Sequence, residues 1–214
     1  MTKPRFAFKI CLAARCFMLR VRVIIFKVGN MEITVIDKSE IVESKWGGGV
    51  TYQLFIAPDG ASYAERRFDF RISTAVVELE ESTFTPLPGV TRYLTPLGKN
   101  GFHLAINGCH PVELAFGEVL RFSGEDDITC YGSGRDLNLM LKGCSGDMRC
   151  LYEGEETTVP KAEYIFVYAV DDQRAVLSDH EQTFACRLRA GDFARLEGVG
   201  RISSSGCLVL FLVY

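Results

Sequence analysis

Two short segments place polar side chains at alternating positions, as a β-strand would need to turn them to one side. Arg71 and Ser73 alternate with mostly apolar residues in segment 70–76, and Asp136 and Asn138 alternate with leucines in segment 136–141. Because successive side chains of a strand point to opposite faces, each pair would share one face of a sheet. Arginine binds a carboxylate through paired hydrogen bonds. An asparagine amide suits an amide or formyl group. These residue types are therefore able to recognise a small polar anion.

The alternation does not show what surrounds these polar faces. Taken alone it favours exposure to solvent, as on any half-exposed antiparallel sheet. If the faces instead line a cavity, a buried charge persists only when it is paired or used. Arg71 and Asp136 would then form either an internal ion pair or part of a recognition set.

Catalytic chemistry has less support in the sequence. The three histidines are scattered at His103, His110 and His180, and no H-x-H pair exists. A metal site of two histidines and one carboxylate is an alternative, because its ligands can come from separate strands. The simpler interpretation is that the histidines lie on the surface or are hydrogen-bonded within the protein. There is no G-x-S-x-G element, and Cys109 and His110 would face opposite sides of a strand. We predict no catalytic residue, no metal site and no cofactor.

Two glycine-rich elements mark turns or close approaches of the backbone. The run of Gly47, Gly48 and Gly49 fits either a structural turn or a backbone pressed against a ligand. It is not a phosphate-binding loop, because no Gly-Lys-Ser/Thr follows. The GSG element at 132–134 lacks the strand-turn-helix context of a dinucleotide site, so a structural turn is predicted there.

Strand-length runs of β-branched, aromatic and leucine residues follow residue 31. They cover 33–36, 52–57, 70–79, 102–106, 137–141, 164–170 and 208–214. Turn signals separate them at 58–60, 88–89, 100–101, 107–108 and 132–134. Only 38–45 suits a short helix. The pattern predicts an all-β sandwich or barrel, with a second small barrel after residue 143. The continuous apolar run 207–214 predicts a last strand that is buried on both sides.

The composition is that of a globular protein. The 214 residues are 48% hydrophobic and 24% charged, with a formal net charge of -3. A nucleic-acid-binding protein usually carries a basic surplus, so nucleic acid is not an expected partner. The eight cysteines form no CxxC pair and match no zinc spacing. We therefore expect free thiols and a cytoplasmic location.

Residues 1–30 differ in composition from the rest. They hold seven basic and no acidic residues, whereas the remainder holds 17 basic and 27 acidic residues. Arginines interrupt every apolar run, so neither a secretory signal nor a membrane-spanning helix is predicted. The segment is either an organelle transit peptide or the translation of codons before a true start at Met31. We expect it to lie outside the fold and contribute little to stability.

Five motifs resemble, in order, those of one protein family. Residues 45–51 (KWGGGVT) resemble a KNGGG-T element, and 70–75 (FRISTA) resemble a WR-S-A element. Residues 84–92 (FTPLPGVTR) match a proline-glycine element that ends in arginine. Residues 122–125 (FSGE) and 136–140 (DLNLM) resemble F-GD and DFN-M elements. Together they resemble the HutD/Ves family, although Trp46, Phe70 and Glu125 depart from its usual asparagine, tryptophan and aspartate.

The resemblance implies a bicupin fold, two small β-barrels in one chain. The first would span 31–142 and the second 143–214. It also implies a sensor or regulator of histidine utilisation without catalysis, and the alternative is a cupin-type enzyme acting on a small metabolite. The expected partner is a small anionic metabolite, such as a histidine-degradation intermediate, with no membrane; a homodimer is allowed. The predicted ligand-binding residues are Lys45, Gly47, Gly48, Gly49, Thr51, Arg71, Ser73, Arg92, Asp136 and Asn138.

Overall fold

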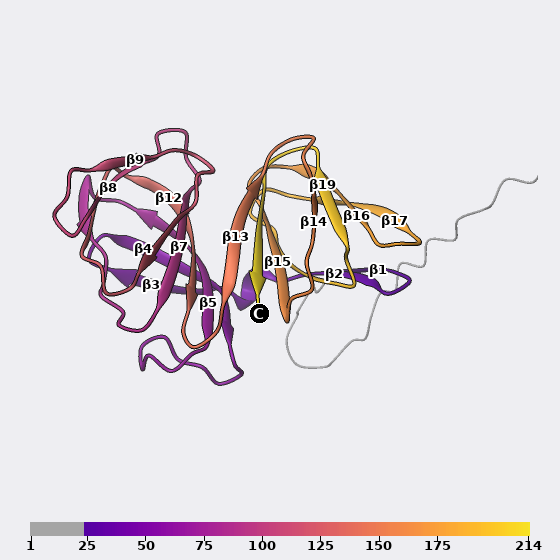
Figure 1. Cartoon of the computed structure of the whole chain (residues 1–214), viewed down its shortest axis with the longest axis horizontal. Helices are drawn as coiled ribbons and strands as arrows, with labels where there is room; N and C mark the ends of the chain where they lie inside the picture. Colours follow the sequence, from indigo (N-terminus) through magenta and orange to yellow (C-terminus); the bar gives the residue numbers. More distant parts are fainter. Residues whose placement is uncertain (1–23) are drawn as a thin grey trace, which may run out of the picture.

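The computed structural model describes residues 24–214, which form β-strands connected by turns and loops. The strands make four antiparallel sheets, arranged as two sandwiches side by side (Figure 1). The predicted all-β, cupin-type class is confirmed. The two sheets of each half stay separate, so each half is a sandwich and not a closed barrel.

The first sandwich contains the segments that carry the family motifs. Its larger sheet has the order β10-β7-β12-β5-β4-β3, and its smaller sheet has the order β6-β11-β8-β9. The larger sheet comprises β3 (Val42–Trp46), β4 (Gly49–Ala57), β5 (Phe70–Val77), β7 (Thr91–Pro96), β10 (Leu120–Ser123) and β12 (Gly134–Leu141). The smaller comprises β6 (Glu81–Thr83), β8 (Phe102–Ile106), β9 (Val112–Leu114) and β11 (Ile128–Tyr131).

The second sandwich is built mostly from the C-terminal part of the chain. Its sheets have the orders β1-β2-β18-β15-β20-β13 and β14-β19-β16-β17. The larger comprises β1 (Ile24–Val28), β2 (Met31–Val35), β13 (Gly146–Leu151), β15 (Tyr164–Ala169), β18 (Phe193–Glu197) and β20 (Leu208–Val213). The smaller comprises β14 (Glu156–Thr158), β16 (Gln173–Ser178), β17 (Thr183–Leu188) and β19 (Arg201–Ser204). The last strand, β20, lies between β15 and β13 with every residue buried, as its continuous apolar sequence predicts.

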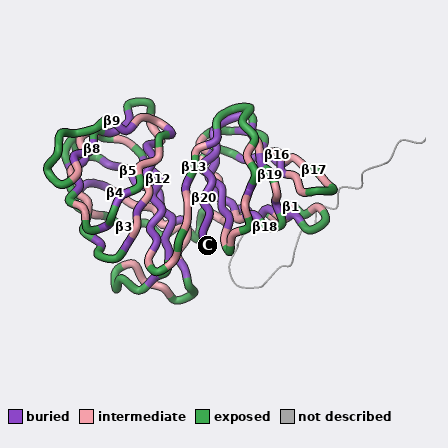
Figure 2. Tube along the Cα trace, viewed as in Figure 1, coloured by how far each residue is buried: buried purple, intermediate pink, exposed green. Residues whose placement is uncertain are grey.

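Alternation along the central strands divides most of the buried apolar residues among three layers. One apolar cluster fills the second sandwich, another lies inside the first, and a third lies where the two large sheets pack on each other. Ile72 and Leu137 belong to this middle layer, together with Phe166 of β15. Buried stretches therefore run through both sandwiches and between them, whereas the outer loops are exposed (Figure 2).

The N-terminal boundary differs from the expected one. Residues 1–23 of the predicted leader lie outside the described residues, but Ile24–Val28 forms β1 and pairs with β2. Strand β2, which the sequence placed in the first half, pairs with β18 of the second sandwich. Its residues Met31 and Ile33 are buried in that core. Alternation identifies such a strand but not the sheet that it joins.

The segment 38–45, which suited a short helix, is mostly extended. A single 3-10 turn covers Lys38–Glu40, where the side chain of Asp37 accepts a hydrogen bond from the backbone of Ser39 at 2.8 Å. Strand β3 begins at Val42. Within residues 24–214, no helix has the length and apolar character needed to span a bilayer.

Candidate functional site

The polar faces of β5 and β12 point into the first sandwich. Arg71 and Asp136 are each only 3% exposed, and Ser73 and Asn138 are also buried. The interpretation that alternation favours solvent is therefore wrong here. The reason is that both faces of these strands are covered: one by the second sandwich and the other by the smaller sheet of the first.

The register of the larger sheet arranges the polar side chains in rows. Met140 on β12 pairs with Arg71 on β5 and with Arg92 on β7, so the two arginines flank it on one face. In the next row, Asn138 pairs with Ser73. The sheet thus brings together two cationic side chains and an amide that lie far apart in the sequence.

Arg71 is held by neutral groups. Its Nε donates a hydrogen bond to Oε1 of Gln53 at 3.0 Å, and its guanidinium lies 4.1 Å from the ring centroid of Tyr63. Burial lowers its pKa, while Tyr63 raises it and Arg66 lowers it further. Among the described residues, Arg71 has no ion pair with Asp136, so the alternative of an internal ion pair is not observed.

Arg92 lies in an aromatic environment. Its guanidinium is 5.1 Å from the ring centroid of Phe84 and 5.0 Å from that of Phe122. Burial lowers the pKa of Arg92 to about 10, against the opposing effects of Tyr63 and Asp136. The guanidinium stays charged at neutral pH, yet its Nε has no hydrogen-bond partner among the described residues.

Asp136 is the buried acid of this interior. Burial raises its pKa to about 7, although Arg92, a backbone hydrogen bond from Ala75 and Arg135 all lower it. Its Oδ1 lacks a partner in the described part of the chain. A group with this pKa can donate or accept a hydrogen bond near neutral pH.

Unpartnered polar atoms concentrate in the first sandwich. Buried polar groups in proteins are nearly always hydrogen-bonded, so a set of exceptions requires an explanation such as a ligand or ordered water. The buried atoms of the first sandwich that have no partner in the described residues are Trp46 Nε1, Ser82 Oγ, Arg92 Nε, Asp136 Oδ1 and Asn138 Oδ1. They include donors and acceptors, and an anion that also carries polar groups would satisfy both kinds.

The glycine run lies at the turn between β3 and β4, and two of its members are required by packing. A side chain at Gly48 would collide with the ring of Trp46 and with Ser82. One at Gly49 would meet the backbone oxygen of Val76. Gly47 has open space around it. At Gly48 and Gly49 the backbone therefore lies close to other residues of the protein itself.

Thr51 and Lys45 lie on opposite faces of the sheet. Thr51 pairs with Ala75, which pairs with Asp136, so Thr51 shares the interior face. Lys45 pairs with Val50, the residue before Thr51, and is exposed. The expectation that Lys45 joins the buried cluster is therefore wrong, because the strand alternation turns its side chain outward.

Two contacts of Arg71 were missing from the predicted set. Gln53 lies two residues after Thr51 on the same strand face, so alternation was a signal that could have included it. Tyr63 lies in the loop before β5, and nothing in its local sequence marks it as a contact of Arg71.

The HutD family profile matches residues 38–206. The chain belongs to the HutD family. It is similar to HutD from Pseudomonas fluorescens SBW25, with 22% identity, a TM-score of 0.68, and coverage of 85% of this chain and 97% of that one. A conserved protein of unknown function from Pseudomonas aeruginosa PAO1 gives 22% identity, a TM-score of 0.70, and 85% and 98% coverage.

A more distant similarity extends the fold comparison. The oxalate decarboxylase of Lactobacillus farciminis, solved as a formate complex, has 8% identity and a TM-score of 0.52 over 87% of this chain and 86% of that one. At this identity the likeness shows the fold alone. The comparison with curated proteins found no match.

The histidines of this HutD family member are separated from the polar interior. His103 lies on β8 with its side chain exposed, and His110 and His180 are exposed in loops. Within the described residues, no three His, Cys, Asp or Glu side chains form a group that could hold a metal ion.

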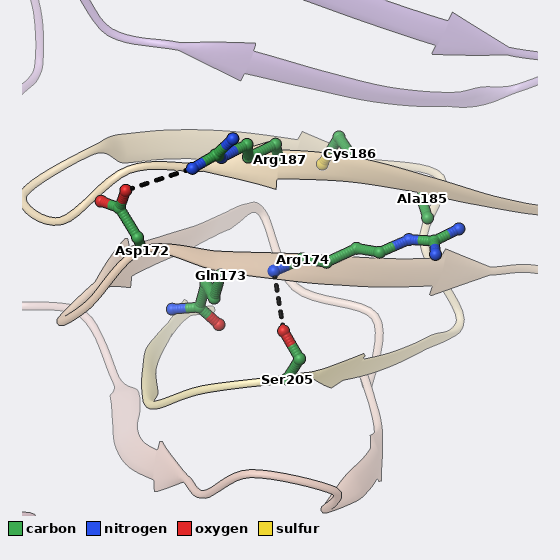
Figure 3. Close-up of a pocket in the computed structure, with 7 residues that line it drawn as sticks. All are labelled: Asp172, Gln173, Arg174, Ala185, Cys186, Arg187 and Ser205. Atoms are coloured by element: carbon green, nitrogen blue, oxygen red, sulfur yellow. Dashed lines mark hydrogen bonds and ion pairs between the residues drawn. The ribbon is translucent and has the colours of Figure 1, made fainter.

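A surface pocket of about 390 Å³ lies on the second sandwich (Figure 3). Arg174 and Arg187 pair across its two strands, and Arg187 forms an ion pair with Asp172 at 3.4 Å. This pocket is shallow and carries exposed, partly compensated charges. A smaller pocket of about 240 Å³ lies closer to the polar interior, because its lining includes Pro96, the partner of Asp136, together with Lys99 and Arg135.

Proposed function

We propose that this HutD family member binds a small anionic metabolite inside the first sandwich and acts, without catalysis, as a sensor or regulator of histidine utilisation. The observation that carries the proposal is the pair of buried guanidinium groups, Arg71 and Arg92, neither of which forms an ion pair with a carboxylate among the described residues. Buried charge without a counterion is costly, and a carboxylate ligand would offset that cost.

The neighbouring groups favour a ligand with more than one polar function. Asn138 lies one row from the arginines, and Asp136 lies one row further along β12. Their Oδ1 atoms accept hydrogen bonds, so they suit an N–H or O–H of the ligand. A carboxylate that also bears an amide-like or imidazole-like group has this combination, and histidine-degradation intermediates belong to this class.

The position of the site supports a regulatory role. Strands β5 and β12 carry Arg71 and Asn138 on one face and Ile72 and Leu139 on the other, and the latter pair packs against the second sandwich. A ligand that shifts these strands would alter the packing between the two halves. A partner that contacts both halves would then detect the bound state.

Calorimetric titration with histidine and its degradation intermediates tests this function. We expect one intermediate to bind the wild type, and Arg71→Ala to weaken binding at least tenfold, since a charge-assisted hydrogen bond contributes roughly 1.5–3 kcal/mol. Lys45→Ala is the matched control and should bind as the wild type does, because Lys45 is exposed on the other face. If no intermediate binds the wild type, the sensor function is contradicted.

The second candidate function is a cupin-type enzyme acting on a small metabolite. One observation favours it: a buried carboxyl group with a pKa near 7 suits general acid–base chemistry. Metal analysis of protein purified without a histidine tag, together with product analysis after incubation with the bound metabolite, distinguishes the two. One equivalent of iron, manganese or zinc, or turnover lost in Asp136→Asn, would favour the enzyme.

A further inference from the structure

The two buried arginines of the proposed site are covered in part by loop residues. Arg71 and Arg92 are only 3% and 6% exposed, so a carboxylate reaches either guanidinium only after a covering element moves. The arginines flank Met140, which belongs to a small apolar cluster with Phe68. Tyr63 packs against this cluster from the loop between β4 and β5. How the loops around the cluster are attached therefore decides which of them can open.

The loop before β7 is firmly attached. The backbone nitrogen of Leu87 donates a hydrogen bond to the oxygen of Gly124 at 2.6 Å, and that of Gly124 donates to the oxygen of Val90 at 2.7 Å. Leu87 and Val90 are also buried members of the apolar cluster. Moving this loop would break backbone hydrogen bonds and expose apolar side chains, so the structure opposes its opening.

The loop between β4 and β5 is attached more weakly. Its segment 58–67, called the lid below, has no buried residue and projects below the strands of the first sandwich in Figure 1. Among the described residues, one hydrogen bond joins the lid to the rest of the protein, from Nζ of Lys142 to the backbone oxygen of Arg66 at 2.5 Å. Its other hydrogen bonds are internal, such as the two between the backbones of Ser62 and Arg67 at 2.8 and 3.0 Å. The lid can therefore move as a unit at the loss of one hydrogen bond and its apolar contacts.

Tyr63 is the part of the lid that touches the site. Its ring centroid lies 4.1 Å from the guanidinium carbon of Arg71, which is buried, and 4.7 Å from that of Arg66, which is exposed. Burial lowers the pKa of both Arg71 and Arg92, and Tyr63 opposes the shift in each, so Tyr63 lies close enough to act on both. A half-buried ring in contact with a buried and an exposed guanidinium lies at the boundary between the site and solvent.

We propose that the lid opens to admit the anion, and that Tyr63 keeps it closed over Arg71 in the free protein. The inference rests on the proposed function for the identity of the ligand, whereas opening is a property of the free protein. It gives Tyr63 a role in access, because opening replaces the cation–π contact of Arg71 by contact with the incoming carboxylate.

Modification by phenylglyoxal, which reacts with arginine side chains, measures opening without any ligand. Peptide mass spectrometry gives the rate at each arginine, and we expect Arg66 to react fast and Arg71 slowly in the wild type. Because Arg71 reacts only while the lid is open, its rate follows the open population. Lys142→Met removes the hydrogen bond to the lid and should raise the Arg71 rate about three- to tenfold. Tyr63→Ala should raise it about tenfold or more.

Matched controls separate opening from nonspecific effects. Lys99→Met changes an exposed lysine, and Tyr152→Ala changes a tyrosine that is 42% exposed after β13. Both should leave the Arg71 rate as in the wild type. Thermal unfolding shows whether each variant is folded, and should Tyr63→Ala fail to fold, Lys142→Met decides.

An excess of propionate, compared with an equal excess of chloride, relates the lid to the anion site. Carboxylate bound at Arg71 should slow its modification. An unchanged Arg71 rate in either folded variant overturns the lid, as does wild-type modification of Arg71 as fast as that of Arg66. If the variants raise the rate but propionate does not slow it, opening of the lid stands and the proposed anion site is contradicted.

Discussion

The two sandwiches have similar layers of strands and opposite interiors. In the second, the inward residues of the central strands β15 and β20 are apolar, for example Val167 and Leu210, and both are fully buried. In the first, the corresponding central strands β5 and β12 turn Arg71, Ser73, Asp136 and Asn138 inward. Apolar packing stabilises a domain, whereas buried polar groups without partners reduce its stability. The comparison indicates that the second sandwich provides a stable apolar support for the strands that carry the site.

The contact between the sandwiches favours the same division of roles. Phe55 and Phe70 of the first sandwich pack with Tyr164 and Phe166 of the second, and the Phe55 and Phe166 ring centroids are 4.8 Å apart. Such aromatic packing stabilises β4 and β5 on the face that points away from the polar interior. The polar interior therefore rests on a sheet whose other face is fixed by an apolar layer.

Leu210→Asn should produce the largest effect. The exchange nearly conserves size, but it places an amide without partners in the apolar core of the second sandwich. We expect a loss of about 4 kcal/mol in the free energy of unfolding, measured by urea denaturation. A loss below about 1 kcal/mol would show that this core tolerates polar groups as well as the first sandwich does.

The pH dependence of stability should come from the first sandwich. The pKa of Asp136 is about 7 in the folded protein and near 4 when unfolded, so the folded state holds the extra proton between these values. Stability should then fall as pH rises, by about 2 kcal/mol from pH 5 to pH 7. Asp136→Asn should remove this slope in denaturation curves, and the control Asp147→Asn should retain it. An unchanged slope in Asp136→Asn would place its origin elsewhere.

A substitution in strand β1 tests whether the residues before Met31 contribute to the second sandwich. Phe26 is partly buried and packs against the core of that sandwich. Phe26→Ala should lower the free energy of unfolding by about 1–2 kcal/mol, less than a fully buried phenylalanine would. Thermal unfolding alongside Lys27→Ala, a neighbouring exposed position, measures it. No effect would support the original expectation that residues before Met31 contribute little.

The smallest effect on stability should come from the reverse of the first exchange. Asn138→Leu removes a buried amide whose Oδ1 has no partner among the described residues, so stability should change by less than about 1 kcal/mol. Ligand affinity should nevertheless fall at least tenfold in calorimetry. A large loss of stability with intact binding would show that Asn138 serves the fold and not the ligand.

The sequence by itself determined the strands, the all-β class and the polar alternation of β5 and β12. These are local properties, since a period of two and the turn residues are readable along the chain. It also carried the resemblance to the HutD/Ves family, and the HutD profile, which matches residues 38–206, confirms the family.

Only the tertiary structure decided which faces became interior. Alternation defines two faces of β5 without saying what covers each, and here both are covered. The same limit applies to Lys45, which lies outside the cluster, and to Met31–Val35, which joins the second sandwich. Tyr63 and Ser82 reach the interior through the loop before β5 and through the small sheet. Such convergence arises from the packing of sheets that are distant in sequence, and no local period encodes it.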